Sequence, residues 1–236
     1  MYNVYLQAIS NKIRPDTFEN FQYYIKVILK EMERCLNSNG ISHFTGQNQT
    51  SKFNLPNSQT ITLALQTQPA AEPPTTAKNE IYIFFKPGDP ESKRLGEILK
   101  QQFNPIYAPQ GNVKLLNTPK SSPINSTETP AVILSIALNQ NIQNISWLQN
   151  NVDILPQIIT SAFCEFFGIP FLGCSDPYSG TVNTDCGVYA RPNLNAKTIR
   201  SLKRGQKIIL QNQWENWYIV GENKSLGYVQ TNFINI

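Results

Sequence analysis

The stretch Pro130-Ala131-Val132-Ile133-Leu134-Ser135-Ile136-Ala137-Leu138 decides the fold of this chain, because its apolar run is too short for a helix of ordinary length. A run of this kind is typical of a strand that is buried on both faces of a sheet. Ser135 lies inside the run and departs from its apolar pattern.

The segment after this strand predicts a helix at 152–166, because apolar residues recur there at helical spacing. Pro156 fits such a helix only in its first turn, and Gly168 supplies the stop. An Asn- and Gln-rich turn separates the strand from this helix. A buried strand followed by an amphipathic helix is the unit of a sheet that helices cover, so we expect the other elements to pack around this pair.

Strands and helices alternate in the rest of the first two thirds of the chain. Apolar patterning predicts strands at 3–8, 41–44, 61–65 and 81–85, and helices at 16–39 and 90–103. A long loop rich in Pro, Ser, Asn and Thr is expected at 104–129. The predicted fold class is α/β, with a mostly parallel sheet covered by helices on both sides.

Composition bounds the number of domains and excludes a membrane protein. A length of 236 residues allows one large and one small domain, and 40% hydrophobic residues can build a core for each. The sequence has no run of about 18 apolar residues, and its N-terminus lacks the basic and apolar regions of a signal peptide. We therefore expect neither a membrane span nor a signal peptide in this sequence.

The four cysteines have no CxxC spacing, which argues against a thiolate zinc site and a dense disulfide framework. Buried thiols are the expectation for Cys35, Cys164, Cys174 and Cys186, with a Cys174–Cys186 disulfide as the alternative.

Positive charge is concentrated in the last quarter of the chain. Residues 177–236 hold seven Lys and Arg against three Asp and Glu, whereas residues 1–176 are balanced. The whole net charge of +4 therefore arises from the last quarter. This asymmetry predicts two domains with different partners.

Short strands follow a linker at 172–180 that is rich in Gly, Ser, Asp and Pro. The strands are predicted at 187–192, 198–202, 206–211, 217–220 and 226–229. Strands at such close spacing are typical of a small β-barrel. The predicted domains are therefore an α/β domain at 1–171 and a small all-β domain at 178–236.

Four motifs of the second domain resemble a known family. They are Val188-Tyr189-Ala190-Arg191-Pro192, Leu202-Lys203-Arg204-Gly205-Gln206-Lys207-Ile208, Asn216-Trp217-Tyr218-Ile219-Val220 and Gly227-Tyr228-Val229. In this order they resemble the bacterial SH3 (SH3b) domain. The resemblance implies an SH3-like barrel that binds bacterial cell wall through peptide stems or cross-bridges.

With that clue, residues 1–171 resemble the zinc-dependent N-acetylmuramoyl-L-alanine amidases, which cut the bond between glycan and stem peptide. The segments that carry the resemblance are Val4-Tyr5-Leu6, Gly40-Ile41, 61–68, 81–99, 130–147 and Phe166-Phe167-Gly168-Ile169. Their order and spacing hold across the whole domain.

The zinc site implied by this resemblance is missing its ligands. The family holds zinc with two His and one Glu, and a second Glu acts as base. At the matching positions the chain has Gln66 for the second His, Gln22 for the ligand Glu and Ser135 for the base. His43 is the single histidine, expected at the surface or at a strand edge, so a two-His site is impossible.

We therefore predict no catalytic residue and no cofactor, with zinc only if the chain is an active amidase after all. Ser135 is not expected to be a nucleophile, because the chain offers it no general base.

Aromatic and basic residues are the candidates for ligand binding in the second domain. Some of its aromatic side chains should fill the barrel while others line a groove, and the candidates are Tyr189, Arg191, Trp214, Trp217 and Tyr228. A basic stretch (Lys197, Arg200, Lys203, Arg204 and Lys207) is either a solvated face or a patch for anionic wall polymers. Nucleic acid is not expected, because no binding motif for it accompanies the stretch.

The sequence thus predicts a cell-wall protein that binds peptidoglycan or its stem peptides through a domain resembling SH3b and carries a degenerate amidase-like domain. One alternative is an active zinc amidase, and another is a protein-interaction scaffold without wall affinity. The resemblance places the chain in the cell wall or outside the cell. The sequence leaves the oligomeric state open.

Overall fold

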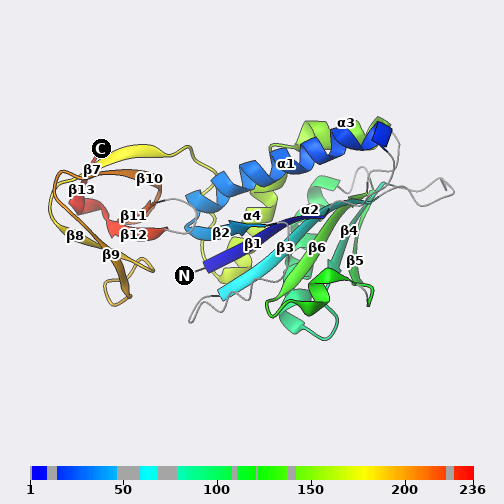
Figure 1. The fold of residues 1–236 in the computed structure, drawn as a ribbon, viewed down its shortest axis with the longest axis horizontal. Coiled ribbons are helices and arrows are strands. Elements are labelled where there is room, and N and C mark those ends of the chain that lie inside the picture. Colours follow the sequence, from blue (N-terminus) through cyan, green and yellow to red (C-terminus); the bar gives the residue numbers. More distant parts are fainter. Residues whose placement is uncertain are drawn as a thin grey trace.

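The computed structural model describes residues 2–9, 15–46, 59–68, 79–107, 111–120, 122–137, 142–221 and 226–236. Within these residues the chain forms a mostly parallel sheet with helices and a separate antiparallel sheet, which lie next to each other along the long axis (Figure 1). We call the elements from β1 to α4 the α/β part and those from β7 to β13 the β part. No helix in the described residues is both long and apolar enough to cross a membrane.

The first sheet is built on the stretch that decides the fold. Its strands are β1 (Tyr2–Ile9), β2 (Ile41–Thr45), β3 (Gln59–Gln68), β4 (Asn79–Phe85), β5 (Gly111–Asn117) and β6 (Ala131–Ala137), in the order β2-β1-β3-β6-β4-β5. β2, β1, β3 and β6 run parallel, whereas β4 pairs antiparallel with β6 and parallel with β5. Residues 131–136 of β6 are all buried, which confirms the central buried strand.

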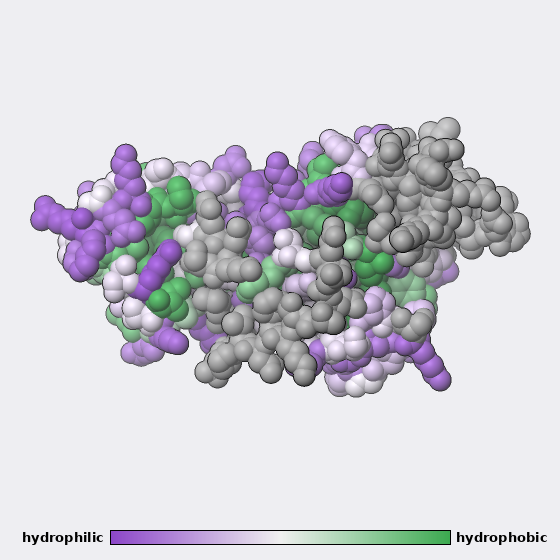
Figure 2. Space-filling model, in the orientation of Figure 1, coloured by the Kyte–Doolittle hydropathy of each residue, from purple (hydrophilic) through white to green (hydrophobic). Residues whose placement is uncertain are grey.

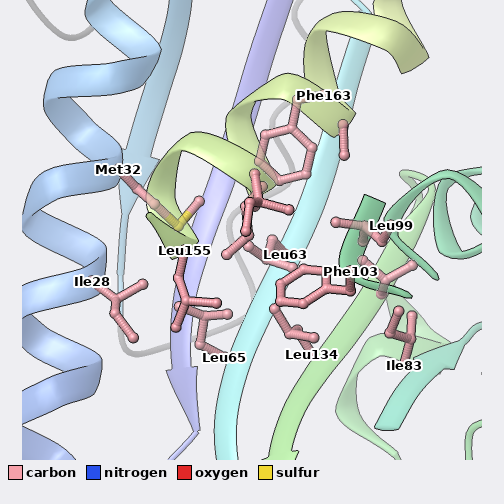
Figure 3. Packing of buried hydrophobic residues seen from close by; sticks show 14 of the residues in the cluster. Ile28, Met32, Leu63, Leu65, Ile83, Leu99, Phe103, Leu134, Leu155 and Phe163 are labelled. Carbon is pink, nitrogen blue, oxygen red and sulfur yellow. The ribbon is translucent and has the colours of Figure 1, made fainter. Parts of the chain in front are cut away.

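The helices of the described residues pack on one face of this sheet. They are α1 (Pro15–Ser38), α2 (Pro90–Tyr107), α3 (Ile142–Asn151) and α4 (Leu155–Phe167). Figure 3 shows α1 and α4 side chains meeting alternate residues of the strands in one hydrophobic cluster, among them Ile28, Met32, Leu63, Leu134 and Phe163.

The expectation of helices on both faces is therefore wrong for the described residues. On the opposite face, Ala64, Ala131 and Ile133 pack with Ile124 of the short 3-10 helix η1 (Pro123–Ser126). That face also carries polar residues such as Asn3 and Gln7, so it offers a helix no continuous apolar surface.

Local signals at the helix ends are confirmed. Pro156 lies in the first turn of α4, and Gly168 ends that helix in the left-handed conformation with φ 69°. Gly40 ends α1 in the same way, with φ 67°. Helix α3 and strand β5 were missed, because each has few apolar residues within a polar segment.

The second sheet contains β7 (Tyr178–Val182), β8 (Cys186–Tyr189), β9 (Thr198–Leu202), β10 (Lys207–Trp214), β11 (Trp217–Val220), β12 (Gly227–Gln230) and β13 (Ile234–Asn235). Its order is β13-β7-β10-β11-β12-β8-β9, with antiparallel pairing, and the 3-10 helix η3 (Thr231–Phe233) precedes β13. The sheet encloses a core of its own that includes Val182, Val188, Leu210, Val220 and Val229. The predicted short strands are thus present, and β7 and β13 are additional.

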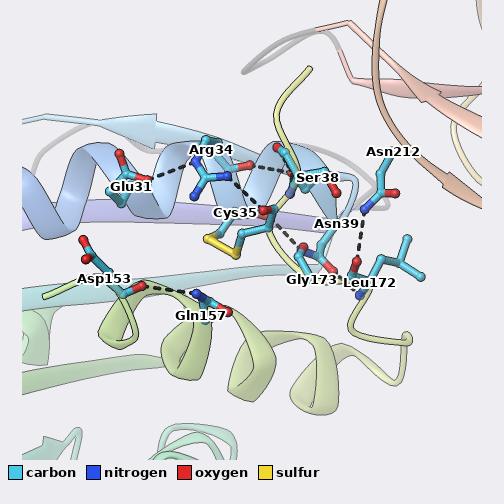
Figure 4. Close-up of a disulfide and its surroundings, with 12 residues drawn as sticks. Glu31, Arg34, Cys35, Ser38, Asn39, Asp153, Gln157, Leu172, Gly173 and Asn212 are labelled. Carbon is cyan, nitrogen blue, oxygen red and sulfur yellow. Dashed lines mark hydrogen bonds and ion pairs between the residues drawn. A yellow bond between two sulfur atoms is a disulfide. The ribbon is translucent and has the colours of Figure 1, made fainter. Parts of the chain in front are cut away.

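A disulfide joins helix α1 to the segment between the two sheets, which corrects the expectation for the cysteines. Cys35 is bonded to Cys174, and not Cys174 to Cys186 (Figure 4). Cys164 is a buried free thiol, as expected, and Cys186 is a half-buried one. Sequence spacing missed this pair because 139 residues separate its members and only the fold brings α1 beside the linker.

The linker is also fixed by hydrogen bonds to the carboxyl end of α1. The Asn39 side chain donates to the carbonyl oxygens of Cys35 and Gly173, at 2.7 and 2.8 Å, and accepts from the Leu172 amide at 2.7 Å. The Ser38 hydroxyl donates to the Ser175 carbonyl oxygen at 2.9 Å. The carboxyl end of α1 thus holds residues 172–175 in place (Figure 4).

Candidate functional site

Two of the three predicted site positions of the α/β part, Gln66 and Ser135, lie in one row across the first sheet. Strand pairing aligns Ile9 of β1 with Gln66 of β3, Gln66 with Ser135 of β6, and Ser135 with Tyr82 of β4. Residues at the same register in neighbouring strands point to the same face, which here is the face opposite the helices. The structure therefore brings Gln66 and Ser135 together on adjacent strands, near the carboxyl ends where parallel sheets hold their ligands.

Ser135 is the most buried residue of this row. Its side chain has no exposed surface, and its hydroxyl oxygen finds no hydrogen-bond partner among the described residues. A buried hydroxyl without a hydrogen-bond partner lowers the stability of the folded chain. Gln66 beside it is half-buried.

Tyr82 completes the row and was missed by sequence reasoning. Its ring stacks on Phe84 with centroids 5.9 Å apart, and Lys114 Nζ of β5 lies 5.7 Å from the centroid of the Tyr82 ring. No sequence signal placed Tyr82 beside Ser135, because β4 enters the sheet antiparallel and its register depends on the whole topology.

His43 lies far from this row. It pairs with Val4, five residues before Ile9, which corresponds to about 16 Å along the strand, and it points to the helix-covered face. β2 is the edge strand as expected, but His43 is only 4% exposed, so a surface position is wrong. Burial lowers the pKa of His43 to about 4, opposed by a backbone hydrogen bond with Ile41.

The remaining positions add no ligand to the row. Gln22 lies in α1, but its side chain is outside the described residues. Among the side chains that are described, no three His, Cys, Asp or Glu residues gather as a metal site would require.

The ligand-binding candidates of the β part form a second group, which we call the aromatic face: Tyr189, Trp214, Trp217 and Tyr228. Tyr189 and Trp217 contact edge to face with centroids 5.6 Å apart, and Trp214 and Tyr228 do so at 6.4 Å. Strand alternation separates Trp217 from Tyr218, whose ring belongs to the core of the β part.

The aromatic face is turned toward the α/β part. Trp217 is 9% exposed and Tyr228 3% exposed, and they cluster with Ile219, Leu226 and Leu172 of the linker. Tyr189 and Trp214 are half-buried at the rim of this cluster. Arg191, the fifth candidate, is exposed, and its guanidinium carbon lies 5.6 Å from the centroid of the Tyr2 ring of β1.

The basic stretch lies along β9, the turn after it and the start of β10. Lys197, Lys203, Arg204 and Lys207 are exposed, and Arg200 is half-buried. Lys203 pairs with Asp185 at 2.8 Å, a surface ion pair that contributes little to stability. Figure 2 shows hydrophilic side chains gathered at the end of the molecule that carries the β part.

Comparison with known proteins identifies the fold of the α/β part. No family model matches the chain, and no curated protein matches it. Among solved structures it is similar to the catalytic domain of CwlV, an N-acetylmuramoyl-L-alanine amidase from Bacillus (Paenibacillus) polymyxa, with 13% identity and a TM-score of 0.57 over 72% of this chain and 100% of that one.

Two further amidases give the same result. The CwlD amidase from Clostridioides difficile, solved in complex with the GerS lipoprotein, has 11% identity and a TM-score of 0.56 over 70% of this chain and 98% of that one. An N-acetylmuramoyl-L-alanine amidase from Clostridium difficile has the same identity and TM-score over 71% and 97%. The chain therefore contains a domain with the fold of the peptidoglycan amidase catalytic domains.

Proposed function

We propose that this chain is a peptidoglycan-binding protein whose amidase-like domain does not hydrolyse the wall. The observation that carries the proposal is the row that holds Gln66 and Ser135. Both matched, by sequence resemblance, positions where the amidases carry a zinc ligand and a catalytic base. Their side chains are a neutral amide and a neutral hydroxyl on adjacent strands.

Zinc does not fit the residues of this row. Zinc sites are built from thiolate, imidazole and carboxylate groups, which bring the cation electron pairs and usually negative charge. Gln66 and Ser135 offer only neutral, weakly donating oxygens, and Ile9 at the same level is apolar.

We assign wall binding to residues 178–236 as a domain of the SH3b type. The antiparallel sheet, its separate core and the order of the four sequence motifs support this assignment. The candidate contacts are Arg191 and the aromatic face, with the basic stretch as a further attraction for anionic wall polymers.

An extracellular or wall location is supported by the Cys35–Cys174 disulfide. Disulfides persist in oxidising surroundings and are rare where cellular thiols stay reduced.

Elemental analysis of the purified protein tests the proposal. We expect well below one zinc per chain and no release of stem peptide from purified peptidoglycan, because one histidine cannot complete the ligand set of the amidases. An active zinc amidase prepared in the same way is the control. Near-equimolar zinc together with turnover that a chelator abolishes would establish the active enzyme instead.

A further inference from the structure

The aromatic face of the β part is occupied by the chain itself. The Tyr228 ring ends against Gly40, at the turn between α1 and β2. A Cβ atom built on Gly40 would lie within van der Waals overlap of the Tyr228 hydroxyl oxygen and 3.5 Å from Ile219 Cδ1. Only glycine leaves room for this close approach, and its φ of 67° also suits glycine best.

The Tyr228 side chain is enclosed between the two parts, with only 3% of the residue exposed and Gly40 against its hydroxyl. Burial raises the pKa of Tyr228, and Tyr2 and Cys164 of the α/β part raise it further. Leu172 of the linker packs against the same cluster, and its carbonyl oxygen accepts a hydrogen bond from Asn212 of β10 at 3.2 Å. A wall ligand therefore cannot reach the Tyr228 ring while this contact persists.

The disulfide shortens the chain that connects the two parts. Ile169 packs on the hydrophobic core of the α/β part, and Tyr178 begins the β part. Nine residue steps between them would reach about 30 Å if extended, but only four steps separate Cys174 from Tyr178, or about 14 Å. With Cys174 bonded to α1, the β part is therefore held next to Gly40.

We propose that the α/β part keeps the aromatic face closed and that reduction of the Cys35–Cys174 disulfide releases this face for peptidoglycan. The proposal rests on the function proposed above. In this step a dithiol reductant gives two electrons and two protons, so that the sulfur–sulfur bond breaks, Cys35 and Cys174 become thiols, and the reductant becomes a disulfide.

The reductant must come from outside the chain. Cys35 is 1% exposed, whereas Cys174 is half-buried, so Cys174 is the more accessible residue of the pair. Burial raises the pKa of Cys164 to about 12, so this thiol stays protonated and does not exchange with the disulfide. Burial also raises the pKa of Cys186.

The α/β part competes with a ligand for the aromatic face and, because the linker joins it to the β part, acts as an intramolecular partner. A short tether gives such a partner an effective concentration on the order of millimolar. The apparent affinity for a ligand falls in proportion to the open fraction, so lengthening the tether raises that affinity. In the closed chain, wall binding relies on exposed cationic side chains, and salt screens their attraction to anionic polymers. In the open chain, binding also buries apolar surface of the aromatic face, and salt does not screen this contribution.

The test compares oxidised full-length chain with the double variant Cys35→Ser/Cys174→Ser and with that variant plus Asn39→Ala. The last change removes the hydrogen bonds to Gly173 and Leu172 without touching the aromatic face. Cys186→Ser leaves the disulfide intact and is the matched control. Two measurements are made: amide hydrogen exchange at 36–44 and 226–230, and co-sedimentation with purified peptidoglycan at low and high salt.

We expect exchange at both segments to rise at least about tenfold in the disulfide-free variants, while exchange at the β7–β10 pair stays unchanged. Peptidoglycan binding should strengthen about fivefold or more and become resistant to salt, and the control should behave as the oxidised chain.

Unchanged exchange in both disulfide-free variants overturns the closed-face proposal. Faster exchange without wall binding at any salt retains the opening step and rejects the wall-binding function. Equal peptidoglycan binding by the oxidised chain and by the disulfide-free variants rejects the proposal that the disulfide controls access to the aromatic face.

Discussion

Ser135 and Ser92 are both serines without exposed surface, but their hydroxyl groups differ in what they bind. Ser92 donates to Asp89 at 2.7 Å and accepts from the Ala131 amide at 2.7 Å, whereas Ser135 has no partner among the described residues. We predict that Ser135→Ala leaves the free energy of unfolding unchanged or raises it by up to about 1 kcal/mol, because an unpaired buried hydroxyl is removed.

Ser92→Ala is the matched control and should lower the free energy of unfolding by about 1–3 kcal/mol, since it leaves the Ala131 amide unpaired. Urea unfolding of the two variants and the parent measures both values. A large loss of stability for Ser135→Ala would mean that this hydroxyl has a hydrogen-bond partner in the folded chain.

His43 should make stability depend on pH. Its folded pKa of about 4 lies below the ordinary value of 6.5, so the unfolded chain binds the proton more tightly. Stability is therefore full above pH 6.5 and is lost as pH falls toward 4. Between pH 7 and pH 4.5 the parent should lose roughly 2–3 kcal/mol more than His43→Gln, which cannot titrate at this position. Parallel losses in the two proteins, measured by urea unfolding, would show that His43 is not buried as described.

At the scale of elements, the carboxyl end of α1 determines where the linker goes. Asn39 is 2% exposed. Its side-chain NH2 group donates to the carbonyl oxygens of Cys35 and Gly173, and its side-chain oxygen accepts from the Leu172 amide. We predict that Asn39→Ala lowers the free energy of unfolding by about 2–3 kcal/mol and speeds proteolysis within 170–177. Asn39→Asp keeps the acceptor for the Leu172 amide and should lose less. Equal losses for the two variants would count against the role of that oxygen.

The elements themselves were predictable where one local signal sufficed. Strand β6 followed from its apolar run, and α4 from its spacing together with Pro156 and Gly168. The Cys35–Cys174 pair, the Asn39 contacts and the position of Tyr82 could not be predicted, because each depends on residues that only the tertiary fold brings together. The same reason explains why the aromatic residues of the β part were identified but their covering by Gly40 was not.

At the scale of the whole molecule, each part has its own hydrophobic core, and the aromatic face of the β part packs on Leu172 of the linker and on Gly40. We predict that residues 1–171 and 178–236, expressed separately, each unfold cooperatively on heating, because each core lies within one fragment. Calorimetry of both fragments checks this. Fragments that aggregate alone and become soluble only when mixed would show instead that contact between the two parts is needed for folding.

We propose that the chain binds peptidoglycan and does not cut it. The most direct test of this proposal is co-sedimentation of the full-length protein with purified peptidoglycan under reducing conditions, with the supernatant assayed for freed stem peptide. We expect the protein to sediment with the wall and to release no stem peptide, because we assign binding to the β part and the Gln66–Ser135 row offers zinc no suitable ligand. Protein that stays in solution, or stem peptide that appears until a chelator is added, would contradict it.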